Sequence, residues 1–161
     1  MDNIKKIAVL GGGSFGTVLA NIAASNGNNV SLWVRDSEQA LRINSEGANS
    51  TYHPELKLSS NIAASENLEE VLKDSDIILI ATPSIIFENI VQRIVPLIEG
   101  GAHIISCTKG IKLDPFRSMS DIISMNVDLN TISLTNNTFS SHVGFICVSL
   151  IDRIYHCNNT I

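Results

Sequence analysis

The sequence predicts an α/β fold in which a doubly wound, mainly parallel β-sheet carries helices on both faces. Short runs rich in β-branched residues alternate with amphipathic segments of helical length, which is the pattern of strands and crossover helices. The chain has 161 residues, of which 44% are hydrophobic. That is enough for one domain with a core and too little for two substantial domains.

The strands are expected, in chain order, at Lys6 to Leu10, Asn29 to Val34, Asn61 to Ala63, Asp76 to Ala81, His103 to Cys107 and Thr131 to Leu134. The helices are expected at Ser14 to Ser25, Ser37 to Ser45, Glu66 to Lys73, Ile85 to Leu97 and Pro115 to Met125. The run Asn26-Gly27 ends the first helix, because both residue types adopt the left-handed C-cap conformation cheaply. Asp36 is placed to cap the second helix, and Gln39 three residues later predicts a capping box.

Charge and cysteine usage exclude several classes of function. The net charge of −5, with only 11 basic residues scattered along the chain, argues against a nucleic-acid partner. The longest apolar stretches are too short to span a membrane and no targeting segment is visible, so we expect a cytoplasmic protein. A metal cluster of His142, Cys147, His156 and Cys157 lacks a carboxylate and regular ligand spacing, and we expect no metal.

The first strand runs directly into a glycine-rich loop, Gly11-Gly12-Gly13-Ser14-Phe15-Gly16, and then into an alanine-rich helix. In a Rossmann-like fold this G-x-G-x-x-G arrangement binds a dinucleotide. Gly11 allows the tight turn, Gly13 lets the backbone approach a pyrophosphate, and Gly16 lets the helix pack against the sheet. The alternative is a turn that merely joins a strand to a helix.

The end of the second strand bears on which dinucleotide fits. An acidic side chain there binds the ribose 2′-hydroxyl, whereas an arginine accommodates a 2′-phosphate. Arg35 stands at this point and Asp36 follows as a helix cap, which favours NADP(H) over NAD(H) by that single residue. The alternative for Arg35 is a solvated charge at a strand end.

Two further segments lie at the carboxyl ends of predicted strands, the edge where open α/β sheets bind ligands. Ala81-Thr82-Pro83-Ser84 follows one strand, and Cys107-Thr108-Lys109-Gly110 follows the next. We expect Pro83 at the cofactor site and Lys109 as an anchor for a phosphate or for the nicotinamide side. The alternatives are a proline turn that opens a helix and an exposed surface lysine.

Several motifs in order resemble one family. They are the glycine loop through Ala20, then Leu32-Trp33-Val34-Arg35, Asn49-Ser50-Thr51-Tyr52-His53-Pro54, Pro83-Ser84 and Thr108-Lys109-Gly110-Ile111. On these motifs the first 135 residues resemble the bacterial-type NAD(P)-dependent glycerol-3-phosphate dehydrogenases.

The resemblance implies an activity and a set of site residues. The family interconverts sn-glycerol 3-phosphate and dihydroxyacetone phosphate by hydride transfer and feeds phospholipid synthesis. By resemblance, Ser14 and Phe15 contact the cofactor, Arg35 borders the adenosine ribose, and Lys109 binds both the cofactor and the substrate.

The chain also departs from the family pattern. His53 and Glu55 replace the usual Leu and Gly, in a loop where we expect both changes to be tolerated. Near the end of the domain Thr138 keeps the register of a substrate-binding hydroxyl, but Asn136 stands where a Gly is expected. We therefore expect a dinucleotide-binding domain at residues 1–135 and an unmatched tail at 136–161. By the resemblance, the family's catalytic Lys lies in a helical domain that we do not expect within these 161 residues, so no catalytic residue is assigned.

Three hypotheses follow. The chain is the truncated cofactor-binding domain of a glycerol-3-phosphate dehydrogenase, with doubtful activity when isolated. Alternatively, it is a non-catalytic NAD(P)H-binding remnant of a frameshifted or truncated gene. A ketopantoate or 6-phosphogluconate type of dehydrogenase is disfavoured, because those lack the Asn-x-x-Tyr-x-Pro segment together with Thr-Lys-Gly. In either of the first two cases, apolar surface left uncovered predicts self-association.

Overall fold

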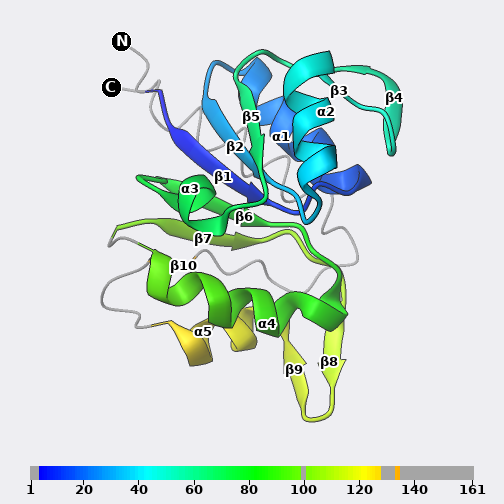
Figure 1. Ribbon diagram of the computed structural model, residues 1–161. Helices are drawn as coiled ribbons and strands as arrows, with labels where there is room; N and C mark the ends of the chain where they lie inside the picture. The colour runs from blue at the N-terminus through cyan, green and yellow to red at the C-terminus, as the bar shows by residue number, and fades with distance from the viewer. Residues whose placement is uncertain (1–3, 99–100, 128–132, 135–161) are drawn as a thin grey trace.

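A six-stranded parallel sheet forms the centre of the molecule (Figure 1). The computed structural model describes residues 4–98, 101–127 and 133–134. The sheet strands are β1 (Lys6–Leu10), β2 (Asn29–Trp33), β5 (Ile62–Ser65), β6 (Ile77–Ile80), β7 (His103–Ser106) and β10 (Ser133–Leu134). Their order across the sheet is β10-β7-β6-β1-β2-β5, and every neighbouring pair is parallel. This is the doubly wound Rossmann order, with the reversal between β1 and β6, and it confirms the predicted fold class.

Helices cover both faces of the sheet (Figure 1). The helices are α1 (Ser14–Ser25), α2 (Ser37–Glu46), α3 (Leu68–Leu72), α4 (Ser84–Ile94) and α5 (Met119–Asn126), and a 3₁₀ turn, η1 (Val95–Leu97), follows α4. Successive strand residues point to opposite faces, so β1 supplies two cores at once. Ile7 and Val9 pack with α1 and α2, whereas Ala8 and Leu10 pack with α3, α4 and α5.

Two short antiparallel hairpins stand outside the sheet, and the sequence did not predict either. One pairs β3 (Ala48–Asn49) with β4 (His53–Lys57), and the other pairs β8 (Ile111–Leu113) with β9 (Phe116–Ser118). The first hairpin extends beside α2 (Figure 1). The second hairpin is joined to α4 by ion pairs of Lys112 and Arg117 with Glu88.

The second hairpin corrects a predicted helix start. The helix expected from Pro115 begins at Met119, because residues 116–118 are taken into β9. Ser118 then caps α5 by accepting from the Asp121 backbone N–H, and the Asp121 carboxylate accepts from the Ser118 backbone N–H and hydroxyl. The hydroxyl bond lowers the pKa of Asp121.

Other predicted helices are also shorter than expected. Asn67 caps α3 by accepting from the backbone N–H groups of Glu69 and Glu70, so this helix starts two residues later than the sequence suggested. Helix α4 ends at Ile94 and continues as the 3₁₀ turn, since Pro96 lacks the N–H that would continue the helical ladder.

The predicted capping box at the start of α2 is wrong. The Asp36 carboxylate does cap this helix, accepting from the Glu38 backbone N–H at 2.9 Å. Gln39, however, does not reach back to Asp36. Its side-chain amide donates to the Gly12 carbonyl oxygen at 2.7 Å instead.

The helices of the described ranges are all short. The longest, α1, has 12 residues, whereas about 20 apolar residues are needed to cross a bilayer. Within these ranges no helix has the length and apolar character of a membrane span.

Candidate functional site

The segments singled out by the sequence meet at the carboxyl edge of the sheet. Residues 11–13 follow β1, residues 81–84 follow β6, and residues 107–110 follow β7. A Cβ on Gly11 would lie 2.5 Å from the Ala81 carbonyl oxygen, so the first two segments are in backbone contact. The Thr108 hydroxyl donates to the Thr82 carbonyl oxygen at 2.8 Å, which joins the second segment to the third.

The glycines of the loop divide into crowded and open positions. Gly11 has φ +127°, a conformation that L side chains rarely adopt. A Cβ on Gly16 would overlap the Gly11 carbonyl oxygen, so α1 approaches the loop as closely as backbone allows. Gly13 has φ −78°, and a Cβ there would meet nothing within 4 Å. The crowded glycines Gly11 and Gly16 therefore flank Gly13, which faces open space.

The start of α1 is suited to an anion. Gly13 occupies the N-cap and no side chain caps this helix, as is also true of α4, whereas Asp36, Asn67 and Ser118 cap α2, α3 and α5. The first N–H groups of any α-helix have no partner within the helix, and the helix dipole adds partial positive charge there. A phosphate that lies over Gly13 would meet these N–H groups, so the residues present fit a dinucleotide pyrophosphate.

Ser14 and Phe15 lie on the first turn of α1 with different exposure. Ser14 is exposed, and both its hydroxyl and its carbonyl oxygen lie 2.9 Å from Nε2 of His53 on β4. Phe15 is half-buried and packs against the core on the α1 side of the sheet. Ser14 thus lies on the exposed side of the loop, whereas Phe15 packs toward the core.

Arg35 lies two residues beyond the end of β2 and has an exposed side chain. Its neighbour Asp36 is engaged as the cap of α2, and Glu38 pairs with Arg42 at 3.8 Å. Asp36 therefore has a structural role that is independent of any ribose.

Pro83 and Lys109 are both exposed, at the ends of their segments. A Cβ on Gly110 would lie 3.0 Å from the Ser84 hydroxyl oxygen, so Lys109 is held beside the start of α4. Next to them the Thr82 hydroxyl is buried without a hydrogen-bond partner in the described part of the chain. An unpaired hydroxyl is costly to bury, so its place at this edge is a further sign of a ligand site.

The remaining sequence-predicted positions belong to the last 27 residues of the chain, 135–161. Thr138 lies outside the described residues, as do His142, Cys147, His156 and Cys157. Within residues 4–98, 101–127 and 133–134, no three His, Cys, Asp or Glu side chains are grouped to hold a metal.

Sequence reasoning missed three side chains that contact the glycine loop. Gln39 and Asn49 both donate to the Gly12 carbonyl oxygen, and His53 contacts Ser14. The loop that contains Asn49 and His53 was noted only as a motif, with no role for its polar groups. The signal available in the sequence was an amide side chain, Asn49, in a short polar segment. An amide needs hydrogen-bond partners if the fold buries it.

Comparisons with known proteins decide the family. The family model described as NAD-dependent glycerol-3-phosphate dehydrogenase N-terminus matches residues 6–136. The chain belongs to this family. The predicted family membership is thereby confirmed. The family's NAD(P)-type cofactor is also the class that the glycine motif predicted.

Individual relatives agree with this assignment. A glycerol-3-phosphate dehydrogenase [NAD(P)+] of Acinetobacter baumannii (strain SDF) is 47% identical over 118 residues, 73% of this chain and 33% of the relative. One from Teredinibacter turnerae is 38% identical over 167 residues, 98% of this chain and 48% of the relative. The crystal structure of glycerol-3-phosphate dehydrogenase from Coxiella burnetii superposes with a TM-score of 0.74 at 28% identity, covering 88% of this chain and 44% of that one. The chain thus spans between a third and a half of the length of these relatives.

The division into crowded and open glycines predicts effects of very different size when a methyl group is added. Gly11→Ala should lower the free energy of unfolding by about 2 kcal/mol or more, because it combines positive φ with a backbone overlap. Gly13→Ala should change it by less than about 0.5 kcal/mol. Urea unfolding followed by circular dichroism measures both, and equal losses would contradict the proposed packing of the loop.

Proposed function

We propose that this domain binds NADP(H) or NAD(H) with the pyrophosphate over Gly13 and at the N-terminus of α1. The observation that carries the proposal is the open space at Gly13, between glycines whose Cβ atoms would overlap backbone. Family membership supports a nicotinamide dinucleotide as the occupant. In this proposal Gly11, Gly13 and Gly16 shape the loop and Ser14 lies beside the phosphates, while Phe15 and Pro83 border the site.

We propose that the reaction served is that of the family: sn-glycerol 3-phosphate and NAD(P)+ give dihydroxyacetone phosphate, NAD(P)H and a proton. The nicotinamide accepts the hydride when the cofactor is bound. Lys109 lies on the sheet edge beside α4, where its ammonium group would attract the substrate phosphate. Thr138 stays a predicted substrate contact.

We infer that turnover requires residues beyond the cofactor-binding segments of this chain. The relatives are two to three times longer than the matched region, and the resemblance places the catalytic Lys of the family in their helical domain. We therefore propose that this chain binds the nucleotide, and that turnover also needs residues of the kind that the longer relatives contain. The division into a binding domain at residues 1–135 and a separate segment at 136–161 is part of the same proposal.

A second candidate function is NAD(P)H binding without turnover. The same loop geometry supports it, because none of the contacts described above requires a substrate. The two candidates differ in whether a reaction follows nucleotide binding.

Titration of the purified chain with NADPH and with NADH, followed by nucleotide fluorescence, tests the proposal. Saturable binding of at least one is expected, and Gly13→Ala should raise its Kd about tenfold or more, because the added methyl group fills the phosphate position. Unchanged stability of Gly13→Ala provides the control for folding.

Absence of saturable binding of both nucleotides would contradict the proposal. A dihydroxyacetone phosphate reduction assay on the same chain addresses turnover. Reduction well above a no-enzyme blank would show that the 161 residues contain a complete active site.

Arg35 is proposed to favour NADP(H). Arg35→Ala should raise the Kd for NADPH about tenfold and the Kd for NADH less than about threefold, because only NADPH carries the 2′-phosphate. Matched fluorescence titrations of both nucleotides measure the two ratios. Arg42→Ala, which removes a neighbouring charge already paired with Glu38, is the control. Equal losses for NADPH and NADH would remove this role from Arg35.

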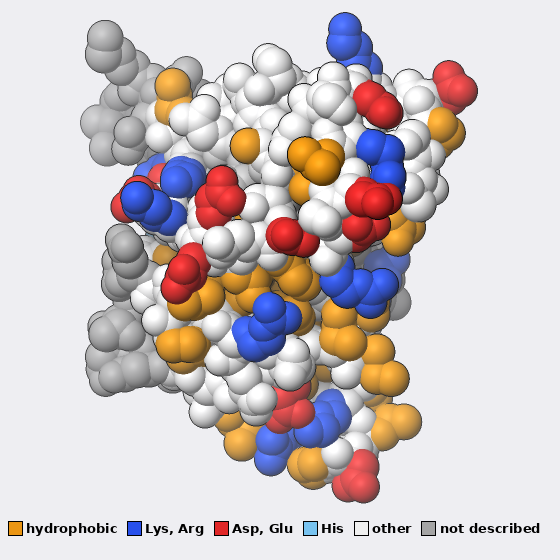
Figure 2. Space-filling view, viewed as in Figure 1, with side chains coloured by type: hydrophobic (Ala, Val, Ile, Leu, Met, Phe, Trp, Pro, Cys, Tyr) orange, Lys and Arg blue, Asp and Glu red, His pale blue; other side chains and the backbone are white. Residues whose placement is uncertain are grey.

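We also propose a cytoplasmic location and no nucleic-acid partner, on the basis of the net charge of −5 and the family's small-molecule chemistry. Self-association is proposed through exposed apolar side chains. Ile85, Leu113 and Phe116 are 92%, 78% and 70% exposed. Figure 2 shows hydrophobic side chains gathered over the end of the molecule that holds the β8–β9 hairpin.

The proposed association predicts a concentration-dependent increase in the sedimentation coefficient. Leu113→Ser together with Phe116→Ser should reduce that increase, because the exposed apolar area falls without loss of core contacts. Analytical ultracentrifugation over a range of protein concentrations measures it. A monomer at every concentration would contradict the proposal.

A further inference from the structure

The carbonyl oxygen of Gly12 is the acceptor for two side-chain amides. Gln39 Nε2 on α2 lies 2.7 Å from it, and Asn49 Nδ2 on β3 lies 3.0 Å from it. Asn49 is 2% exposed, and Gln39 is half-buried. These bonds join the glycine loop to two side chains that are distant in sequence, with separations of 27 positions for Gln39 and 37 positions for Asn49.

The donors and acceptors of this network fix its direction. A carbonyl oxygen can only accept, so both side chains must present their NH₂ groups to Gly12. The second hydrogen of Gln39 Nε2 is then donated to Asn49 Oδ1 at 3.2 Å, and that of Asn49 Nδ2 to the Thr17 hydroxyl at 2.8 Å. Thr17 in turn donates to the Gly13 carbonyl oxygen at 2.7 Å. Every hydrogen of the two amides is used once.

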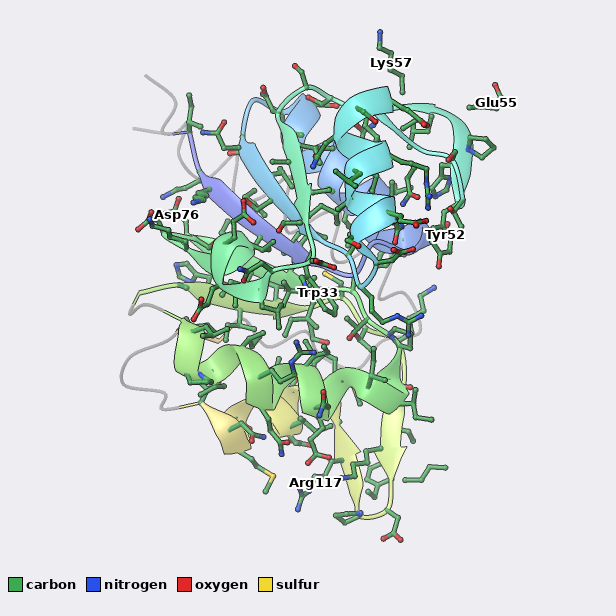
Figure 3. The ribbon with its side chains drawn as sticks, in the orientation of Figure 1. Trp33, Tyr52, Glu55, Lys57, Asp76 and Arg117 are labelled. Atoms are coloured by element: carbon green, nitrogen blue, oxygen red, sulfur yellow. The ribbon has the colours of Figure 1, made fainter. Side chains whose placement is uncertain are left out.

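The position of Asn49 is itself secured by the β3–β4 hairpin. Asn49 pairs with His53 in the hairpin register, and the Tyr52 backbone N–H donates to the Asn49 carbonyl oxygen at 3.0 Å. His53 Nε2 contacts the Ser14 carbonyl oxygen at 2.9 Å. Figure 3 shows Tyr52 at the turn of this hairpin, toward the start of α1. The hairpin therefore contacts the glycine loop at both Gly12 and Ser14.

Holding a carbonyl also orients the next N–H. In a planar trans peptide the C=O and N–H bonds point in opposite directions, so a Gly12 carbonyl turned toward Gln39 and Asn49 turns the Gly13 N–H away from them. By the same rule, the Thr17 bonds to the Gly13 carbonyl orient the Ser14 N–H. A glycine peptide meets little steric resistance to rotation, so without these bonds the Gly12 carbonyl could turn toward the ligand side. There it would repel a phosphate.

We propose that Asn49 and Gln39 are positioning residues for the phosphate site: they hold the Gly12–Gly13 peptide so that an N–H, and not a carbonyl, faces a bound pyrophosphate. The inference rests on the proposed function for the identity of the ligand. The orientation of the peptide itself is independent of that identity.

Isosteric acid variants test the proposal. Asn49→Asp and Gln39→Glu keep the shape of each side chain but replace the NH₂ donor by an oxygen, which cannot donate to the Gly12 carbonyl. Asn28→Asp is the matched control. Asn28 is also 2% exposed, and its Nδ2 donates to the Ala23 carbonyl oxygen at the opposite end of α1.

Asn49→Asp is expected to raise the Kd for NADPH and NADH about tenfold, and Gln39→Glu about threefold or more, while Asn28→Asp leaves both within about twofold. In the double variant the two effects should not add, because both side chains act on one carbonyl. In ¹H–¹⁵N spectra without nucleotide, the Gly13 amide resonance should move in Asn49→Asp and in Gln39→Glu, hereafter the loop-contact variants, and remain in place in Asn28→Asp.

The outcomes separate this inference from the proposed function. If the unsubstituted chain binds NADPH and NADH and the loop-contact variants bind both as tightly as it does, the positioning role is overturned. If the unsubstituted chain binds neither, the proposed function fails, and the Gly13 resonance alone decides: an unmoved resonance in folded Gln39→Glu overturns the inference. Should Asn49→Asp fail to fold, Gln39→Glu provides both readouts, since its side chain is only half-buried.

Discussion

The close approach of α1 to the first strand is the contact on which the rest of the site depends. A Cβ at Gly16 would overlap the Gly11 carbonyl oxygen, and a Cβ at Gly11 would crowd the Ala81 carbonyl oxygen. Only glycine at both positions lets the helix begin this near the sheet. The N-terminus of α1 is thereby placed at the carboxyl edge, beside the ends of β6 and β7, where the polar segments of the chain meet.

A loop made of glycines gains close approach but has little conformational preference of its own. The structure supplies the missing restraint from outside the loop, through Gln39 and Asn49 on one side and the β1–β2 contact of Gly11 N–H with the Trp33 carbonyl on the other. Buried amides are suited to this because each offers two directed donors. The small β3–β4 hairpin adds no strand to the main sheet, but through Asn49 it contacts the loop proposed to bind phosphate.

The sequence predicted the parts of the fold that depend on local patterns. The bounds of β1 and α1 follow from an apolar run, a glycine loop and an Asn-Gly stop, and the structure reproduces them. It did not predict β4, whose residues His53–Lys57 are mostly exposed and show no apolar alternation. Gln39 shows the other limit. The local capping rule predicts that the Gln39 side chain accepts from the Asp36 backbone N–H. In the structure its NH₂ group donates instead to the buried Gly12 carbonyl oxygen, which is distant in sequence. The positions of Gly11, Gly13, Arg35 and Lys109 could be anticipated from motifs, whereas the side chains that orient the loop depend on tertiary contacts.

Nucleotide phosphates are proposed to bind at the start of α1. Chemical-shift mapping of the ¹⁵N-labelled chain with NADPH tests this most directly, because it reports each amide separately. We expect the largest shifts at Gly13, Ser14 and Phe15, whereas Gly27 and Asn28, which follow the far end of α1, should be unchanged. Saturable shifts centred elsewhere, with the Gly13 to Phe15 amides unmoved, would contradict it.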